Sequence, residues 1–231
     1  MHSARFCETR RVNRALTASV ERRALVWLAA RLPAWVGSDH LTVLALLAMC
    51  GAGASFWAAG QLHPVALLLV VASLAINWFG DSLDGTLARV RDQQRPRYGY
   101  YVDHVVDCLG TAVLFGGLAL SGYMSPLVAL GVLVTYLLVS AEVYLATHSL
   151  AEFRMSSFGV GPTELRLILA AGTLALFFDP RVAVFGGQYR LFDVGGAIAM
   201  GAMTVALLVS VVRNVLTLYR AEPLPQRASC L

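Results

Sequence analysis

The chain has 231 residues, of which 58% are hydrophobic and only 14% are charged, and its net charge is +4. Its mean hydropathy of +0.66 is too high for an ordinary soluble domain. We therefore expect an all-α polytopic integral membrane protein, with a main domain at 39–220, a basic N-terminal segment at 1–38 and a C-terminal tail at 221–231. We expect no nucleic-acid partner.

The N-terminal segment is rich in arginine. Apolar residues between Leu16 and Ala29 recur at roughly helical spacing, and arginines such as Arg22 and Arg23 lie among them. This pattern predicts an amphipathic helix at the membrane interface, with its arginines directed at anionic lipid headgroups. A basic tail without such a helix is the alternative.

Six apolar runs follow, each near the roughly twenty residues needed to cross the hydrocarbon. Arginines gather at alternate connections between these runs, and only Arg181 and Arg190 fall on the opposite side, in the loop expected before the last run. Short cytoplasmic loops collect basic residues. We therefore expect both termini in the cytoplasm of a bacterial cell, with the protein in the inner membrane. The predicted spans are 41–60, 64–90, 98–121, 125–149, 162–178 and 193–219.

Four aspartates lie near the connection between the second and third runs, two at the end of one and two at the start of the other. An ionised group there persists only if it is paired, bound to a cation or facing water. Asp81 and Asp84 share one stripe of a helix, and Asp103 and Asp107 share another. The connection between these helices is short and polar, so the two helices should be antiparallel neighbours with facing stripes. Four carboxylates would then converge at the cytoplasmic membrane edge. Hard oxygen ligands of this kind suit Mg²⁺ or Mn²⁺, and one carboxylate can bridge two ions.

Small residues in the same stripes favour a ligand beside the metal. Gly85, Ala88 and Gly99 remove side-chain bulk, which lets a flat ligand lie against the backbone. Arg89 can supply a guanidinium to a phosphate. The two stripes together predict a metal-assisted phosphoryl-group transfer.

The two stripes closely resemble the signature of the CDP-alcohol phosphotransferase (CDP-alcohol phosphatidyltransferase) family. That signature is DxxDGxxAR followed by GxxxDxxxD, and the chain has DSLDGTLAR at 81–89 and GYYVDHVVD at 99–107. The gap between the halves is nine residues, at 90–98, where eight are usual, and the extra residue falls in the expected loop. A six-helix layout with an amphipathic N-terminal segment also looks like this family.

The resemblance implies a phospholipid-biosynthetic transferase that moves a phosphate-linked group from a CDP-linked donor to an alcohol or lipid acceptor. The reaction would release CMP by direct displacement with two Mg²⁺ or Mn²⁺ ions. The resemblance also implies a possible homodimer. Asp107 would be a metal ligand, the general base or both. The other implied residues are Asp81, Asp84 and Asp103 for metal, and Gly85, Ala88, Arg89 and Gly99 for the nucleotide.

His104 and the segment 153–166 resemble the choline and ethanolamine phosphotransferase branch of the family. In that branch the base is thought to be the histidine beside the third aspartate. Neighbouring helical residues point about 100° apart, so His104 either acts in catalysis or acceptor binding, or packs against another helix. Glu164 and Arg166 are candidates for substrate contact, although an acidic residue in a first helical turn also has an ordinary role at the helix end.

Several alternatives remain open at this point. The donor is either CDP-diacylglycerol, used with a soluble alcohol, or a soluble CDP-aminoalcohol, used with diacylglycerol. A membrane transporter whose acidic residues bind a translocated cation, an inactive family member, and a set of salt bridges to loop arginines are the other interpretations of the four aspartates.

Overall fold

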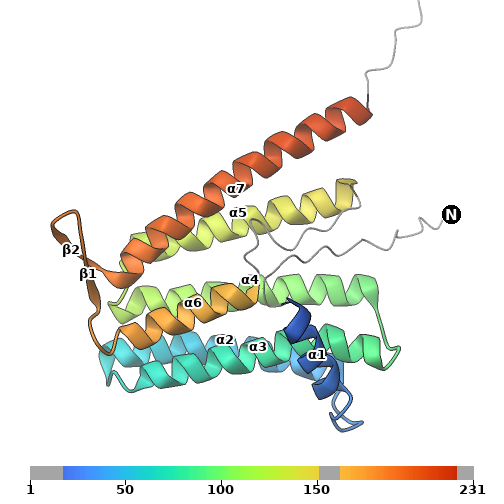
Figure 1. The fold of residues 1–231 in the computed structure, drawn as a ribbon, viewed down its shortest axis with the longest axis horizontal. Helices are drawn as coiled ribbons and strands as arrows, with labels where there is room; N and C mark the ends of the chain where they lie inside the picture. The colour runs from blue at the N-terminus through green and yellow to red at the C-terminus, as the bar shows by residue number, and fades with distance from the viewer. Residues whose placement is uncertain (1–17, 151–161, 223–231) are drawn as a thin grey trace, which may run out of the picture.

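The structure is a computed structural model that describes residues 18–150 and 162–222. Most of these residues are helical, and the helices run back and forth along one direction (Figure 1). In chain order the elements are α1 (Ala18–Ala29), α2 (Ser38–Gln61), α3 (Ala66–Val90), α4 (Pro96–Ser121), α5 (Pro126–Leu150), α6 (Pro162–Ala175), β1 (Arg181–Val184), β2 (Gly187–Arg190) and α7 (Leu191–Ala221).

Five of these helices are long and apolar enough to cross a membrane, namely α2, α3, α4, α5 and α7. The predicted helical fold is therefore confirmed, and five such helices are consistent with a polytopic integral membrane protein. The span predicted at 162–178 corresponds to α6, which has 14 residues. At 1.5 Å per residue α6 is about 21 Å long, shorter than a hydrocarbon layer of about 30 Å. The described residues thus contain five helices of spanning length where the sequence predicts six.

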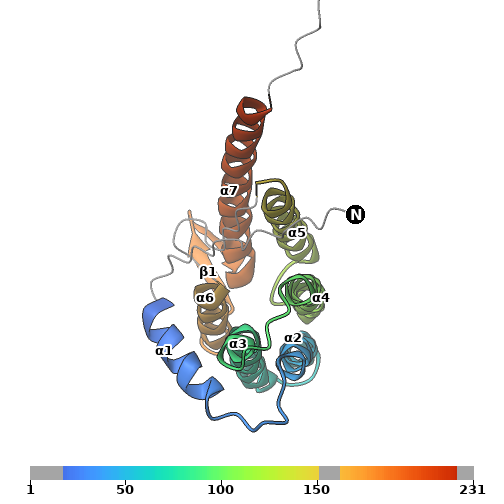
Figure 2. The same ribbon diagram turned by 90° about the vertical axis from the view of Figure 1, so that its right-hand side faces the viewer.

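Helix α2 is the common neighbour of α3 and α4. These two helices are antiparallel, as predicted, but each packs mainly against α2 and not against the other (Figure 2). The core between them is apolar and includes Phe56, Leu67 and Leu118, all of which are fully buried. Burial of such side chains contributes roughly 1.5–3 kcal/mol each in a soluble protein. In a membrane, close packing contributes more of the stabilisation than removal from water.

Glycines bring the backbones of these helices close together. A Cβ atom added to Gly80 of α3 would lie 2.6 Å from the carbonyl oxygen of Leu41 in α2, and one added to Gly53 would lie 2.5 Å from that of Val113 in α4. A Cβ on Gly117 would collide with the backbone of Gly53. Small residues that permit such approaches are typical of helix contacts in membranes.

The remaining helices are attached to this group in two ways. Helix α6 packs against α3, while α7 packs against α5 and diverges from the other helices toward its C-terminus (Figure 1). Polar contacts join α5 to α7, because Glu142 accepts hydrogen bonds from Ser210 (2.9 Å) and Asn214 (2.7 Å). A carboxylate placed this deep in apolar helices requires partners of this kind.

Helix α1 lies across the end of α3 that carries the aspartate motif. Leu25 and Ala29 of α1 pack in one cluster with Leu83 and Leu87 of α3. The guanidinium of Arg91 donates hydrogen bonds to three backbone carbonyls between residues 32 and 36, which secures the connection to α2. The placement of α1 at a membrane interface stays a prediction.

The loop predicted before the last helix contains a short β-hairpin, which the sequence did not predict and which leaves the all-α class unchanged. Strands β1 and β2 are antiparallel, and Val184 pairs with Gly187. Phe185 and Gly186 form the two-residue turn, both with positive φ angles. Two-residue turns with two positive φ angles normally contain Asn-Gly or Asp-Gly, so this Phe-Gly pair gave no hairpin signal in the sequence.

Two neighbouring glycines of α4 provide a matched test of this packing. Gly117→Ala should lower the free energy of unfolding by about 1–3 kcal/mol, because its Cβ collides with α2. Gly116→Ala should leave it unchanged or raise it by up to about 1 kcal/mol, because nothing lies within 4 Å and alanine favours the helix. Unfolding in mixed micelles measures both, and equal effects of the two substitutions would contradict the packing described.

Candidate functional site

Three of the four predicted aspartates converge. Asp81 of α3 and Asp103 and Asp107 of α4 each offer one carboxylate oxygen, and these oxygens all lie within 4.8 Å of one another. The four-residue spacing of Asp103 and Asp107 places them one above the other on the same face of α4. Asp103 is seven residues from the start of α4, so the cluster lies about 10–16 Å along that helix. The prediction that the two stripes meet is confirmed for these three residues.

Asp84 is held separately, one turn along α3. Its side chain is buried, and its carboxylate accepts a hydrogen bond from the hydroxyl of Thr42 in α2 (2.7 Å). The hydroxyl of Ser38 donates to the backbone carbonyl of Asp84 (2.9 Å). Neither contact was predicted from the sequence, because a hydroxyl near the start of a helix is already explained by a role in capping. The metal-binding role of Asp84 stays a prediction.

Arg166 of α6 lies directly beside the three carboxylates. Its Nη2 donates to Asp81 (2.6 Å), and its Nε donates to the amide oxygen of Asn77 (2.7 Å). The amide nitrogen of Asn77 in turn donates to the carbonyl of Ala45 in α2 (3.0 Å), as expected for a buried polar group that joins helices. The Nη1 of Arg166 is buried without a hydrogen-bond partner among the described residues. A buried donor that lacks a partner is costly, and an anion beside the carboxylates would supply one.

His104 faces α5, the neighbouring helix. Its ring lies 4.1 Å from that of Tyr100 and 4.6 Å from that of Tyr144, measured between centroids. Its Nδ1 is 2.7 Å from the carbonyl oxygen of Tyr100 and 3.7 Å from a carboxylate oxygen of Asp103. This geometry matches the packing alternative for His104, and its role in catalysis stays a prediction.

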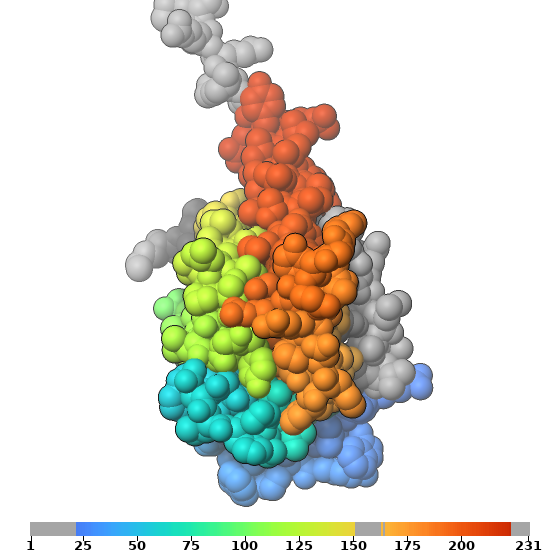
Figure 3. Space-filling model, turned by 90° about the vertical axis from the view of Figure 1, so that its left-hand side faces the viewer, coloured from blue at the N-terminus to red at the C-terminus, as the bar shows by residue number. Residues whose placement is uncertain are grey.

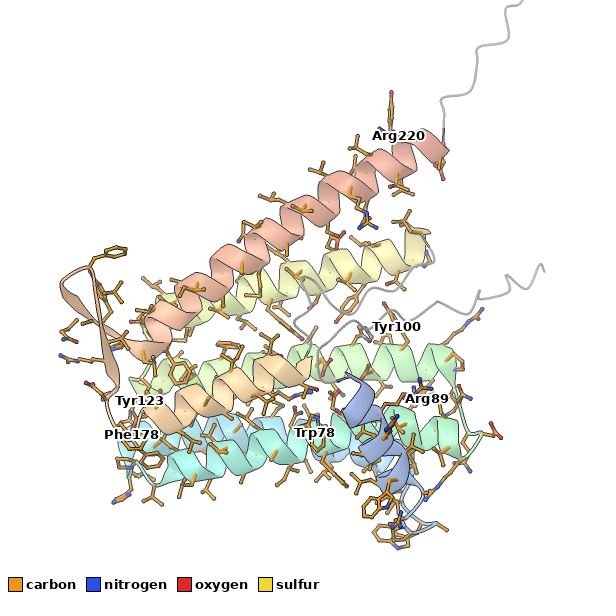
Figure 4. All side chains as sticks on the ribbon, in the orientation of Figure 1. Trp78, Arg89, Tyr100, Tyr123, Phe178 and Arg220 are labelled. Carbon is orange, nitrogen blue, oxygen red and sulfur yellow. The ribbon has the colours of Figure 1, made fainter. Side chains whose placement is uncertain are left out.

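The predicted nucleotide residues lie at the ends of α3 and α4 that face the α3–α4 loop. A Cβ added to Gly85 would meet only the guanidinium of Arg89, at 3.5 Å, and one on Gly99 would meet nothing within 4 Å. Arg89 is exposed near this end of the molecule and donates to the hydroxyl of Thr86 (Figure 4). Ala88 lines a cavity of about 440 Å³ that also includes the ion-paired side chains of Asp39 and Arg95. The side chain of Glu164, in the first turn of α6, lies outside the described part of the structure.

The donor set fits a divalent cation. Three ionised carboxylates beside one guanidinium leave a net charge of −2, which one Mg²⁺ or Mn²⁺ would neutralise. Carboxylate oxygens are the ligands that these hard ions prefer. A second ion would need further ligands, and the nearby carboxylate of Asp84 and the phosphates of a substrate are the available kinds of donor.

Comparisons with known proteins bear on the family and the fold of the chain. The family model described as CDP-alcohol phosphatidyltransferase matches residues 35–212. Among solved structures, the chain is similar to the crystal structure of Mycobacterium tuberculosis phosphatidylinositol phosphate synthase with CDP-DAG bound. The sequence identity is 20%, the TM-score is 0.59, and the match covers 85% of this chain and 94% of that chain, which shows a shared fold. No curated protein matches.

The carboxylate cluster is testable by metal binding alone. Asp103→Asn and Asp107→Asn should each weaken Mn²⁺ binding at least about tenfold, because each removes a charged oxygen ligand. Electron paramagnetic resonance of free Mn²⁺ in titrations of the solubilised protein measures this affinity. The control is Asp92→Asn in the exposed α3–α4 loop, where φ is 53° and asparagine is equally tolerated. Equal Mn²⁺ affinity in all three variants would show that the cluster holds no metal.

Proposed function

Because the chain belongs to the CDP-alcohol phosphatidyltransferase family, we propose that it transfers a phosphatidyl group from CDP-diacylglycerol to a hydrophilic alcohol and releases CMP. The observation that carries this proposal is the convergence of Asp81, Asp103 and Asp107 within the intact family motif. Such a site can bind the metal and the phosphates that the reaction needs. Membership of the family makes the protein a transferase of phospholipid synthesis, and the choice of donor and acceptor is our proposal.

Two observations favour CDP-diacylglycerol over a CDP-aminoalcohol. The similar synthase from Mycobacterium tuberculosis was crystallised with CDP-DAG, and its fold covers most of this chain. The likeness to the choline and ethanolamine branch rested largely on His104, whose ring here packs against those of Tyr100 and Tyr144. A CDP-aminoalcohol with diacylglycerol as acceptor remains the second candidate.

The residues of the site support a direct displacement. Mg²⁺ or Mn²⁺ held by Asp81, Asp103 and Asp107 would neutralise the pyrophosphate and polarise the reacting phosphorus. Asp107 accepts the proton of the alcohol hydroxyl. The alcohol oxygen forms a bond to the lipid-linked phosphorus, and the bond from that phosphorus to the bridging oxygen breaks, so that CMP leaves with the electron pair. Arg166 directs its Nη1 donor at a phosphate oxygen and stabilises the charge that develops there.

The space around two glycines supports a position for the nucleotide. Packing inside the protein does not require glycine at 85 or 99, whereas it does at 53 and 117. We assign the space beside Gly85 and Gly99 to the nucleotide, with Ala88 and Arg89 at its border. Glu164 is retained as a candidate for contact with the acceptor.

The orientation of the protein in the membrane is inferred from the residues at the two ends of the helix bundle. Arg89 and Arg220 lie at one end, and Tyr123 and Phe178 lie at the other (Figure 4). The concentration of arginines at the first end supports a cytoplasmic site in a bacterial inner membrane.

The predicted homodimer stays a prediction, and all three carboxylates of the site come from one chain. A cation transporter has no use for the nucleotide motif, and the intact carboxylates argue against an inactive family member.

The decisive test is the release of CMP. Purified protein with Mg²⁺ should release CMP from CDP-diacylglycerol when supplied with glycerol phosphate, inositol, inositol phosphate or serine, and release none from CDP-choline or CDP-ethanolamine with diacylglycerol. Asp107→Asn should abolish the release, and Asp92→Asn should not affect it. Release only from the CDP-aminoalcohols would establish the second candidate. No release from any donor would contradict the enzyme interpretation.

A second test concerns the nucleotide position. Gly85→Ala should lower kcat/KM for the CDP-linked donor at least about tenfold, or about 1.4 kcal/mol, because its methyl group occupies the proposed ligand space. Thermal stability should be unchanged or slightly raised, since the new Cβ would touch only the end of the Arg89 side chain and alanine favours a helix. Gly201→Ala in α7, where nothing lies within 4 Å, is the control and should leave kcat/KM unchanged with a stability effect of the same sign. Unchanged kinetics of Gly85→Ala would place the nucleotide elsewhere.

A further inference from the structure

The β1–β2 hairpin lies far from the carboxylate site. It connects the end of α6 to the start of α7, at the end of the molecule opposite to Arg89 (Figures 1 and 4). The hairpin lies at a steep angle to the helix axes (Figure 1). In the view onto this end of the molecule it lies at the front (Figure 3). Helix α7 is long and apolar enough to cross a membrane. The hairpin therefore lies where that span reaches the membrane surface.

The tip of the hairpin has an unfavourable residue for a turn in water. Phe185 has a φ of 47°, in the left-handed region that bulky residues avoid. Its side chain is fully exposed, at 107% of the reference area. Asparagine or glycine would adopt this turn without either cost. An aromatic ring at this place is favourable if it is buried in something outside the chain, such as the acyl region of a membrane.

The apolar character extends along one face of the hairpin. Val182 pairs directly with Tyr189 across the strands, and Val184 lies on the same face because side chains alternate along a strand. Tyr189 is 53% exposed, and Phe178, just before the hairpin, is 91% exposed. Aromatic residues of this kind are enriched where membrane spans meet water.

The other face carries two arginines directly opposite each other. Arg181 pairs with Arg190 in the strand register, and like charges in that position destabilise a hairpin. No ion pair joins either guanidinium to a carboxylate within residues 18–150 and 162–222. Asp179 accepts a hydrogen bond from the backbone N–H of Arg181 (2.8 Å). Two facing guanidiniums become mutually favourable when one phosphate binds both of them.

We propose that the hairpin binds the lipid surface on the side of the membrane opposite to the active site. Phe185 inserts at the boundary of the acyl chains, and Arg181 and Arg190 together bind the phosphate of a lipid headgroup. The position at the end of a membrane span, the apolar face and the paired cations all fit this occupant. The hairpin thereby fixes the outer end of α7, the helix that diverges from the others.

A tryptophan at the tip tests this contact. The Phe185→Trp variant is reconstituted in phosphatidylcholine vesicles, and its fluorescence is compared with that of the parent chain, which has four tryptophans. The added tryptophan should be protected from acrylamide. Adding Arg181→Gln and Arg190→Gln should increase its quenching by a factor of about 2 or more. In vesicles of a phosphate-free digalactosyl lipid, the Phe185→Trp variant should be quenched as strongly as its double glutamine variant is in phosphatidylcholine. In that lipid the two glutamine substitutions should make no further difference to the quenching.

Two controls separate this site from general effects. Arg22→Gln with Arg23→Gln removes the same charge from exposed positions on α1 and should leave the quenching of the added tryptophan unchanged. In the variants with Phe185→Trp, Arg181→Gln and Arg190→Gln, CMP release should be the same as in the parent chain, because the hairpin has no part in the active site. Full access of acrylamide in phospholipid vesicles would show that the tip stands in water or serves a protein partner. Equal protection in both lipids and in the double glutamine variant would show that the arginines bind no phosphate.

Discussion

The site depends on the close contact of α2 with both α3 and α4. The aspartates of the motif belong to two helices that make little direct contact, so their separation is set by the helix that both of them touch. Glycines at 53, 80 and 117 bring the backbones together at these contacts. A small increase in either spacing would move Asp81 away from Asp103 and Asp107. The geometry of the carboxylate cluster is therefore a consequence of packing at positions outside the cluster.

The charge of the cluster is partly balanced by one residue of a fourth helix. Arg166 of α6 neutralises Asp81, and Asn77 holds the guanidinium in place through Nε. Charged groups at this depth in apolar helices need partners, and a cation from solution would neutralise the remaining negative charge. Arg166 retains an unused donor, so in the proposed reaction it can contact an anionic substrate without leaving Asp81. The same side chain would then link the proposed metal site to the substrate.

The sequence predicted the helices and the carboxylate cluster because both depend on local regularities. Apolar runs located the spanning helices, and the spacing of four between Asp103 and Asp107 located the facing stripe. Contacts between distant segments have no such signal, so the hydrogen bond from Thr42 to Asp84 and the edge-to-face contact of His104 with Tyr144 were not predicted. The hairpin was missed because its turn contains Phe185 where a polar residue is usual.

The glycines of the chain separate two kinds of constraint that look identical in sequence. Those at 53, 80 and 117 are required by a neighbouring helix, while those at 85 and 99 face open space. Glycine costs about 1 kcal/mol relative to alanine inside a helix, so an open glycine lowers stability without any packing gain. Open glycines also occur at 116 and 201, which shows that openness alone identifies no site. What distinguishes 85 and 99 is that each lies within one helical turn of an aspartate of the motif, so a ligand attracted to that charge would pass against their bare backbone.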